Sequence, residues 1–331
     1  MKQLRLLIWV LVIFAVVSCE QKDLCYDHEP HAHRTQFQLR LSFDCEWEYN
    51  IENHIDWEQQ WKPEYGIAYG DIAPKEPEGV RVHIYNEDDQ TETVRNLTRQ
   101  HNTISFNEEG HYDMIFYNND TEYILFEGLD SFHTAKATTR GGHVRNAVMN
   151  TPDMLFGAFV DSIFVERQAV PDTLDVVLRP LVYTYLLRFE VAKGAGLIKH
   201  ADGVLSGMAT GVHLSKRHTT TSTGLLTFEC TMQGDYGVQA LVRSFGIPGY
   251  PTPHYSRGYE ETYPHELYLN VSLTNGKTQS FKYDITEQMR KQPHGGVILI
   301  QDMEIEENST GGGAFNVGVD GWGEIVHVPL N

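Results

Sequence analysis

The side chains with metal-binding chemistry gather in one short run near the N-terminus. Residues 28–33 are His-Glu-Pro-His-Ala-His, and imidazoles two positions apart lie on one side of an extended segment. The spacing is not that of the H-E-x-x-H zinc motif, and Pro30 excludes the helix on which that motif depends. A polar linker also offers no surrounding groups to orient the ligands. We therefore predict a solvated linker here, with no metal and no cofactor.

The sequence shows none of the residue spacings typical of an active site. Residues 203–207, Gly-Val-Leu-Ser-Gly, place the serine one position too late for the G-x-S-x-G turn of hydrolases. The Gly-Ala-Gly at 194–196 lacks the third glycine and the strand–helix setting of a dinucleotide site. The chain carries 45 acidic and 26 basic residues, a net charge of -19. Chance carboxylate pairs are therefore expected, and a phosphate-binding stripe of Lys and Arg is not. We predict no enzyme and no nucleic-acid binding.

Cys19 has the most specific chemistry in the chain. It follows a basic start and an apolar run at 6–17. That run is too short for a bilayer-spanning helix, which needs about 20 residues, but it fits the apolar core of a signal peptide. The stretch Val-Val-Ser-Cys at 16–19 resembles the bacterial lipobox, in which the cysteine becomes the acylated, palmitate-bearing N-terminus. We expect an outer-membrane lipoprotein anchored to the bilayer through Cys19; the alternative is an ordinary signal peptide with an incidental cysteine.

The other three cysteines, Cys25, Cys45 and Cys230, form at most one disulfide within the chain because their number is odd. A Cys25–Cys45 bridge would join the polar segment after Cys19 to the first strand. Cys45 and Cys230 each alternate with apolar neighbours and equally fit small buried side chains. The sequence leaves the disulfide state open.

Two aromatic clusters are candidate contact surfaces. Trp57 and Trp61 lie close to Trp47 and could stack on a sugar ring; the alternative is that Trp47 belongs to the first core and the others close a loop over it. The second cluster lies in a Pro-rich loop and consists of Tyr250, Tyr255, Tyr259 and Tyr263. Tyrosine gives contact area at a low entropic cost. This loop is therefore a candidate partner surface or, equally, an ordered crossover.

Two short motifs near the middle of the chain combine an acidic, a hydroxyl and an apolar residue. They are Asp-Ser-Ile at 161–163 and Asp-Thr-Leu at 172–174. Both resemble the O-glycosylation signal of Bacteroidetes periplasmic proteins. Ser162 and Thr173 are therefore candidate glycosylation sites.

The elements that carry these residues are strands. Residues 36–47 alternate apolar and polar side chains, as a half-buried strand does, and 48–78 are an acidic, aromatic insert. The turn residues at 118–120 predict a hairpin, and Asn275-Gly276 is the strongest hairpin signal in the chain. Short helices are expected at 201–209 and 286–291. Further strands are expected at 80–84, 112–116, 123–126, 174–178, 183–191, 225–230, 238–245, 267–273, 279–285, 297–300 and 325–329.

Short strands at this spacing predict an all-β protein rather than a parallel α/β sheet. We expect four parts: a signal peptide at 1–18, a tether at 19–34, and β-sandwich domains at 35–168 and 174–331. Each domain has its own set of strands, so each is expected to fold alone.

Several short motifs resemble one group of surface proteins. The segment at 19–28, Tyr-Asn-Asn-Asp-Thr-Glu at 117–122 and Phe-Asn-Val-Gly-Val-Asp-Gly-Trp at 315–322 resemble an uncharacterised family of Bacteroidetes lipoproteins. Leu-Ser-Gly-Met-Ala at 205–209 and Phe-Lys-Tyr-Asp-Ile-Thr at 281–286 resemble fimbrillins and minor-fimbrium anchor proteins. The resemblance implies two transthyretin-like β-sandwiches in tandem and a place in surface fimbriae.

The resemblance also implies partners, namely other fimbria-like subunits at the cell surface. We expect a non-catalytic subunit or anchor, with a role in adhesion, in which a strand from one subunit fills a vacant sheet edge of the next. After the glycines at 311–313, the side chains of Phe315, Val317 and Val319 share one face, and Trp322 continues the apolar tail. This tail is either the donated strand or a last strand of the second domain. The alternative function is a glycan-binding lipoprotein that uses the Trp-rich insert at 47–69.

Overall fold

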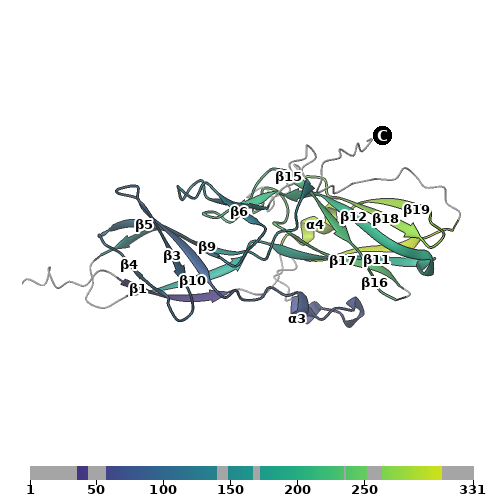
Figure 1. Ribbon diagram of the computed structural model, residues 1–331, viewed down its shortest axis with the longest axis horizontal. Coiled ribbons are helices and arrows are strands. Elements are labelled where there is room, and N and C mark those ends of the chain that lie inside the picture. Colours follow the sequence, from purple (N-terminus) through teal and green to yellow (C-terminus); the bar gives the residue numbers. More distant parts are fainter. Residues whose placement is uncertain are drawn as a thin grey trace, which may run out of the picture.

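The computed structural model describes residues 36–43, 57–139, 148–166, 172–234, 236–251 and 263–307. These residues form an elongated molecule built almost entirely from strands, with two groups of sheets placed one after the other along its long axis (Figure 1). The predicted all-β fold with tandem sandwiches is confirmed. Among the described residues, no helix is both long and apolar enough to cross a membrane.

The N-terminal group contains a seven-stranded sheet that folds over on itself. Strands β9 and β10 pair only at Phe156 with Pro180 and Gly157 with Arg179. Beyond that point the strands diverge, and side chains from both halves of the sheet share one buried core. In sheet order the strands are β3 (Glu92–Leu97), β2 (Val80–Asn86), β5 (Gly110–Asn118), β9 (Phe156–Val165), β10 (Asp172–Pro180), β1 (Gln36–Phe43) and β4 (Thr103–Ser105).

A second, four-stranded sheet covers the outer face of β2 and β5. Its order is β14 (His218–Thr219), β13 (Gly211–His213), β7 (Lys136–Thr139) and β6 (Ile124–Glu127). The hairpin predicted at 118–120 is therefore wrong, because β5 and β6 belong to different sheets. The side chain of Asn118 bonds to the backbone of Met154 and Phe156, which turns the chain out of the first sheet. Tyr117 then stacks on Phe126, with ring centroids 4.2 Å apart.

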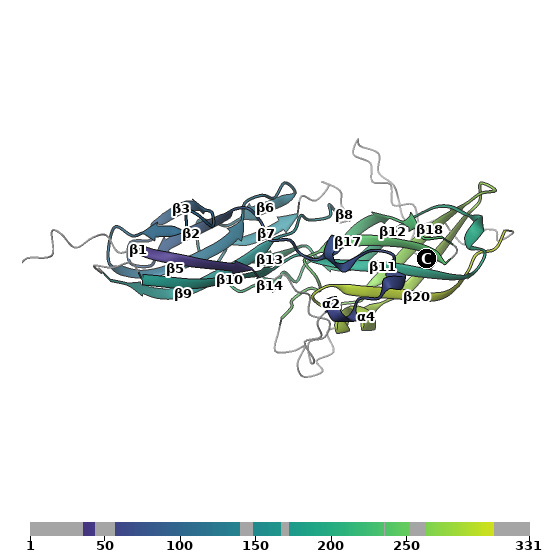
Figure 2. The same ribbon diagram turned by 90° about the horizontal axis from the view of Figure 1, so that it is seen from below.

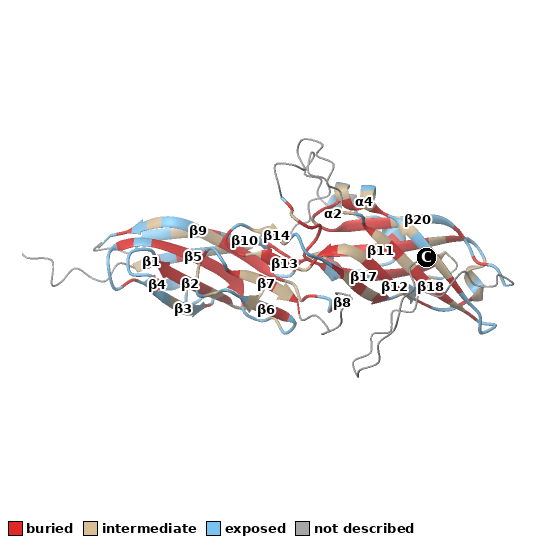
Figure 3. Ribbon diagram, turned by 90° about the horizontal axis from the view of Figure 1, so that it is seen from above, coloured by how far each residue is buried: buried red, intermediate tan, exposed pale blue. Residues whose placement is uncertain are grey.

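The C-terminal group is a sandwich of two sheets around the largest buried core. Many residues along its strands are buried (Figure 3). One sheet has the order β16 (Thr231–Met232), β17 (Gly237–Ser244), β11 (Tyr183–Lys193) and β20 (Gly296–Glu304). The other has the order β19 (Thr278–Asp284), β18 (Glu266–Leu273), β12 (Ile198–Ala209), β15 (Thr223–Glu229) and β8 (Val148–Met149). Two short helices, η3 (Ala195–Leu197) and α4 (Thr286–Lys291), complete it.

The helix expected at 201–209 is part of strand β12. Its core residues, Ala201, Leu205 and Met208, have the spacing of a helix face. A register shift between Leu205 and Met208 produces that spacing within a strand, because Gly207 adopts a left-handed φ of 80° and moves Met208 onto the buried face. The other two local predictions are confirmed: α4 spans Thr286–Lys291, and Asn275-Gly276 turns β18 into β19.

In the part of the chain that the structure describes, three segments cross between the two groups of sheets. Strands β13 and β14 follow β12 in the chain but join β7, and β8 joins β15. The third segment, residues 57–72, contains α2 (Trp57–Gln60), η2 (Pro63–Tyr65) and α3 (Tyr69–Ile72), and we call it the strap. The strap packs on Leu186 of β11 and Val297 of β20 (Figure 2). These contacts all cross the boundary predicted between 168 and 174, which itself stays a prediction.

His265, just before β18, predicts a pH-dependent stability. It is 1% exposed, and burial lowers its pKa from 6.5 to about 4. The unfolded chain therefore binds this proton more readily than the native chain, so stability is lost as the pH falls from about 6.5 towards 4. The shift corresponds to about 3 kcal/mol.

Because other groups titrate too, the test compares the free energy of unfolding of a variant with that of the wild type. His265→Gln should lose less stability than the wild type over this pH range, as measured by urea unfolding. If the free energy of unfolding of His265→Gln and of the wild type fell equally with pH, His265 would not be the source of the effect.

Candidate functional site

A strand edge lies partly open in the N-terminal group, beside β1. Strand β1 runs parallel to β10 on one side and antiparallel to β4 on the other. Strand β4 is short and pairs only with Gln36 to Gln38. Asn102 extends the pairing by one residue: its carbonyl accepts the N–H of Leu39 at 2.8 Å, and its side-chain Nδ2 donates to the Leu39 carbonyl at 2.8 Å.

Beyond Leu39 this edge of β1 has no partner among the described residues. Successive residues of a strand direct their backbone groups to opposite edges. Because Leu39 bonds towards β4, the N–H and C=O groups of Leu41 and Phe43 also point to that side. Their side chains are only partly buried against the core. The strand therefore presents unpaired backbone groups and apolar side chains at the same place.

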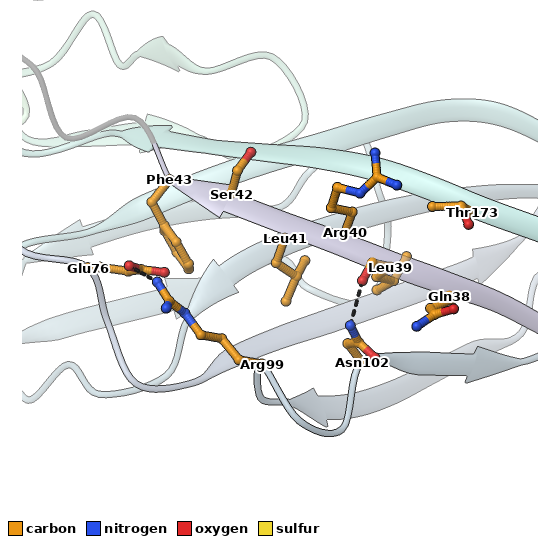
Figure 4. A pocket seen from close by; sticks show the side chains of 10 residues that line it. All are labelled: Gln38, Leu39, Arg40, Leu41, Ser42, Phe43, Glu76, Arg99, Asn102 and Thr173. Carbon is orange, nitrogen blue, oxygen red and sulfur yellow. Dashed lines mark hydrogen bonds and ion pairs between the residues drawn. The ribbon is translucent and has the colours of Figure 1, made fainter.

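A cavity of about 530 Å³ lies along this edge (Figure 4), and we call it the β1 groove. Its far wall carries Arg99 and Glu76, which form an ion pair across from Leu41 and Phe43. The lining residues are Gln38, Leu39, Arg40, Leu41, Ser42, Phe43, Glu76, Arg99, Asn102 and Thr173.

The charges around the groove are already paired. Arg40 lies 3.1 Å from Asp175 on β10, with both side chains exposed, so this pair adds little stability. Because Arg99 is paired with Glu76, neither positive nor negative charge predominates in the groove. Such a site favours an extended peptide, which binds through main-chain hydrogen bonds and alternate side chains, over a highly charged ligand. In the part of the chain that the structure describes, no cluster of three or more His, Cys, Asp or Glu side chains is placed to hold a metal ion.

The strap accounts for the position of Trp61. Its ring packs against Tyr65 and Tyr69, at 4.9 and 5.7 Å between centroids, and its Nε1 donates to the Ile67 carbonyl at 2.7 Å. These contacts fit the loop-closing alternative, although Trp61 closes over the C-terminal sandwich rather than over Trp47. Nothing in them favours glycan stacking. The side chain of Trp57 and the whole of Trp47 lie outside the described residues.

The burial of Tyr250 fits the ordered-crossover alternative for this loop better than a partner surface. Tyr250 is 8% exposed and belongs to the core of the C-terminal sandwich. Its backbone exchanges hydrogen bonds with Thr219: its N–H donates to Oγ1 and its carbonyl accepts the N–H, each at 2.8 Å. Tyr263 is partly buried. The other site residues expected from the sequence lie outside the described residues; they are Cys19, Tyr255, Tyr259, Phe315, Val317, Val319 and Trp322.

The two candidate glycosylation residues are both exposed. Ser162 lies at a register shift of β9 with a left-handed φ of 51°, and its N–H donates to Asp113 Oδ1 at 2.9 Å. Thr173 lies on β10 at the rim of the β1 groove (Figure 4). Their glycosylation stays a prediction. Cys230 is a partly buried free thiol whose pKa burial raises to about 12, which fits an unreactive packing residue.

The sequence alone does not predict most of the groove. The alternation at 36–47 places Leu41 and Phe43 on the inner face of the first strand, but it gives no reason to expect an open strand edge there. Arg99, Glu76 and Asn102 reach the groove through long-range packing. The one local signal was the brevity of β4, three residues between polar turns.

The comparisons with known proteins agree with this architecture. A family model described as a domain of unknown function (DUF5119) matches residues 66–229. Over 297 residues the chain is 25% identical to a Bacteroides ovatus protein named "Putative fimbrium anchoring subunit Fim4B", covering 80% of this chain and 89% of that protein. The predicted resemblance to fimbrium-anchor proteins is therefore confirmed.

A solved structure shares the fold. The crystal structure of a putative adhesin from Bacteroides ovatus has a TM-score of 0.59 at 20% identity, covering 86% of this chain and 96% of that one. The fimbrial anchor protein Mfa2 from Porphyromonas gingivalis matches at a TM-score of 0.45 and 11% identity, over 80% of this chain and 90% of that one.

Proposed function

We propose that this protein is a non-catalytic, fimbria-associated subunit of the bacterial cell surface that joins a neighbouring subunit by strand pairing in the β1 groove. The observation that carries the proposal is the open edge of β1, where the backbone groups of Leu41 and Phe43 have no partner among the described residues and lie beside a cavity of about 530 Å³. Similarity to a fimbrium anchoring subunit supports the setting. A strand from the neighbour would satisfy these groups and bury the two apolar side chains.

Leu41→Pro tests the pairing directly. By the alternation along β1, the Leu41 N–H faces the groove, so proline removes a donor there and leaves the bonds to β10 intact. Leu41→Ala is the matched control, because it shortens the side chain but keeps the N–H. We expect Leu41→Pro to bind purified fimbrial subunits about ten-fold more weakly than Leu41→Ala, which is the value of one hydrogen bond. Surface plasmon resonance measures both, with melting curves to show that both fold. Equal affinities would contradict the proposal.

The proposal includes attachment to the outer membrane through acylated Cys19. Only 16 residues separate Cys19 from the start of β1 at Gln36, so the anchor would hold the groove near the membrane. Acyl chains give stable binding that a polar tether cannot replace. We expect Cys19→Ala to move the protein from the membrane fraction to the soluble fraction, while Cys25→Ala stays with the membrane. Detergent-phase partitioning reads out both, and membrane retention of Cys19→Ala would overturn the lipid anchor.

A further inference from the structure

The C-terminal sandwich closes one of its own strand edges with side chains. Among the described strands, β20 is an edge strand, paired on one side with β11. On its other side, two glutamines of the α4 region replace a neighbouring strand. Gln288 accepts the Leu299 N–H at 2.9 Å and donates to the Leu299 carbonyl at 3.0 Å. Gln292 does the same with Val297, at 2.7 and 2.9 Å.

The spacing of the two glutamines along the α4 region agrees with the spacing of the backbone groups along β20. Residues four apart on a helix are separated by about 6 Å along its axis, and residues two apart on a strand by about 6.6 Å. One helical turn therefore brings two amides opposite two successive backbone pairs on the same edge. Met289, fully buried between them, fixes α4 to the core. We call Gln288 and Gln292 the edge guard.

The strand segment behind the guard would pair readily if it were uncovered. Residues 296–300 are Gly-Val-Ile-Leu-Ile, with no charge and no proline, the composition that favours strand addition at an exposed edge. Farther along, β20 is protected in another way. Asp302 has a left-handed φ of 59° that bends the strand, and the Ile305 N–H returns to the Lys193 carbonyl. Only the stretch at 297–299 depends on the glutamines.

We propose that the edge guard prevents two copies of this chain from joining through β20. The occupant of the uncovered edge would be a second β20 running antiparallel about a two-fold axis. Such a pair needs no other segment, because each copy offers the same uncharged run to the other. It would merge two β16-β17-β11-β20 sheets into one continuous sheet. The edge guard belongs to the C-terminal sandwich and acts independently of strand pairing in the β1 groove.

The test is Gln288→Ala combined with Gln292→Ala in the full chain carrying Cys19→Ala. The matched control is Glu287→Ala with Arg290→Ala, which removes the exposed ion pair of the same helix. We expect the double glutamine variant to double its mass in light scattering at micromolar concentration, while the control stays monomeric. Adding Leu299→Lys should restore the monomer, because a charged side chain then interrupts the uncharged edge run in both copies.

A folded double variant that stays monomeric would overturn the proposal. Equal dimerisation of the Glu287/Arg290 control would also overturn it. If the double variant does not fold, Gln288→Ala alone keeps the Gln292 bonds and should dimerise in proportion to concentration; a monomer at every concentration then rejects the guard. Capture of some other protein with no self-association would likewise contradict the second copy as occupant.

Discussion

Replacing Arg188 with methionine is expected to lower the free energy of unfolding by about 3 kcal/mol and to loosen the strap. Arg188 lies on β11 and is 5% exposed. Its guanidinium sits 3.8 Å from the Tyr236 ring centroid and 5.6 Å from that of Tyr65. It also donates to the Glu64 carbonyl at 2.6 Å and to Glu190 Oε1 at 2.9 Å. Methionine keeps the apolar bulk but leaves the Glu64 carbonyl without its donor.

Two measurements check this effect. Urea unfolding gives the stability, and hydrogen exchange at the amides of Tyr65 and Gly66, which bond back to Lys62 and Pro63, reports on the strap. The control is Arg243→Met on β17, where the arginine is exposed, and which should change stability by less than about 0.5 kcal/mol. An Arg188→Met variant as stable as this control would show that the strap is held by its apolar contacts alone.

Adding a single methyl group at Gly203 should be at least as damaging, at about 4 kcal/mol. Gly203 lies in the middle of β12, with β18 and β15 on either side. A Cβ there would lie 2.2 Å from the Tyr268 carbonyl oxygen and 2.5 Å from the Phe228 ring. The first contact is with backbone, so no change of rotamer relieves it, and the central strand itself would have to move.

Gly196→Ala is the matched comparison for Gly203→Ala. Gly196 belongs to η3, and a Cβ there meets no atom within 4 Å, so its variant should stay within about 0.5 kcal/mol of the wild type. Thermal and urea unfolding of both variants measure the difference. Equal stability of the two would mean that β12 can shift within its sheet.

Local patterns predicted the local structure well. Alternation at 36–43 gave strand β1, whose Phe37 and Leu39 are buried. Asn275-Gly276 gave the turn between β18 and β19, because Gly276 adopts the left-handed φ of 83° that such a turn needs. These features depend on neighbouring residues only, so a single sequence contains all the information they require.

Features that depend on contacts between distant segments could not be predicted from the sequence in the same way. The bulge at Gly207 gives the buried residues of strand β12 the spacing of a helix face. It shifts the alternation of buried and exposed residues without a break in the sequence pattern. The strap lies between β1 and β2 in the chain, yet it packs on β11 and β20, more than a hundred residues away. The β1 groove depends on how far β4 extends and on Arg99 meeting Glu76. Each of these is decided by packing between distant segments, on which local periodicity carries no information.

The strap and the groove are also joined along the chain. The strap ends at Ile72, and Glu76 of the groove wall follows four residues later. One wall of the groove therefore lies within four residues of a segment that packs on the C-terminal sandwich. The two groups of sheets thus share contacts although each has its own core.

The most direct test of strand pairing in the β1 groove is hydrogen exchange of the Leu41 and Phe43 amides with and without a bound fimbrial subunit. Binding should slow exchange at both amides by at least about ten-fold, because they gain strand partners. Exchange at Val94, on the outer strand β3, should not change. A complex that forms while Leu41 and Phe43 exchange as fast as in the free protein would contradict strand pairing in the β1 groove.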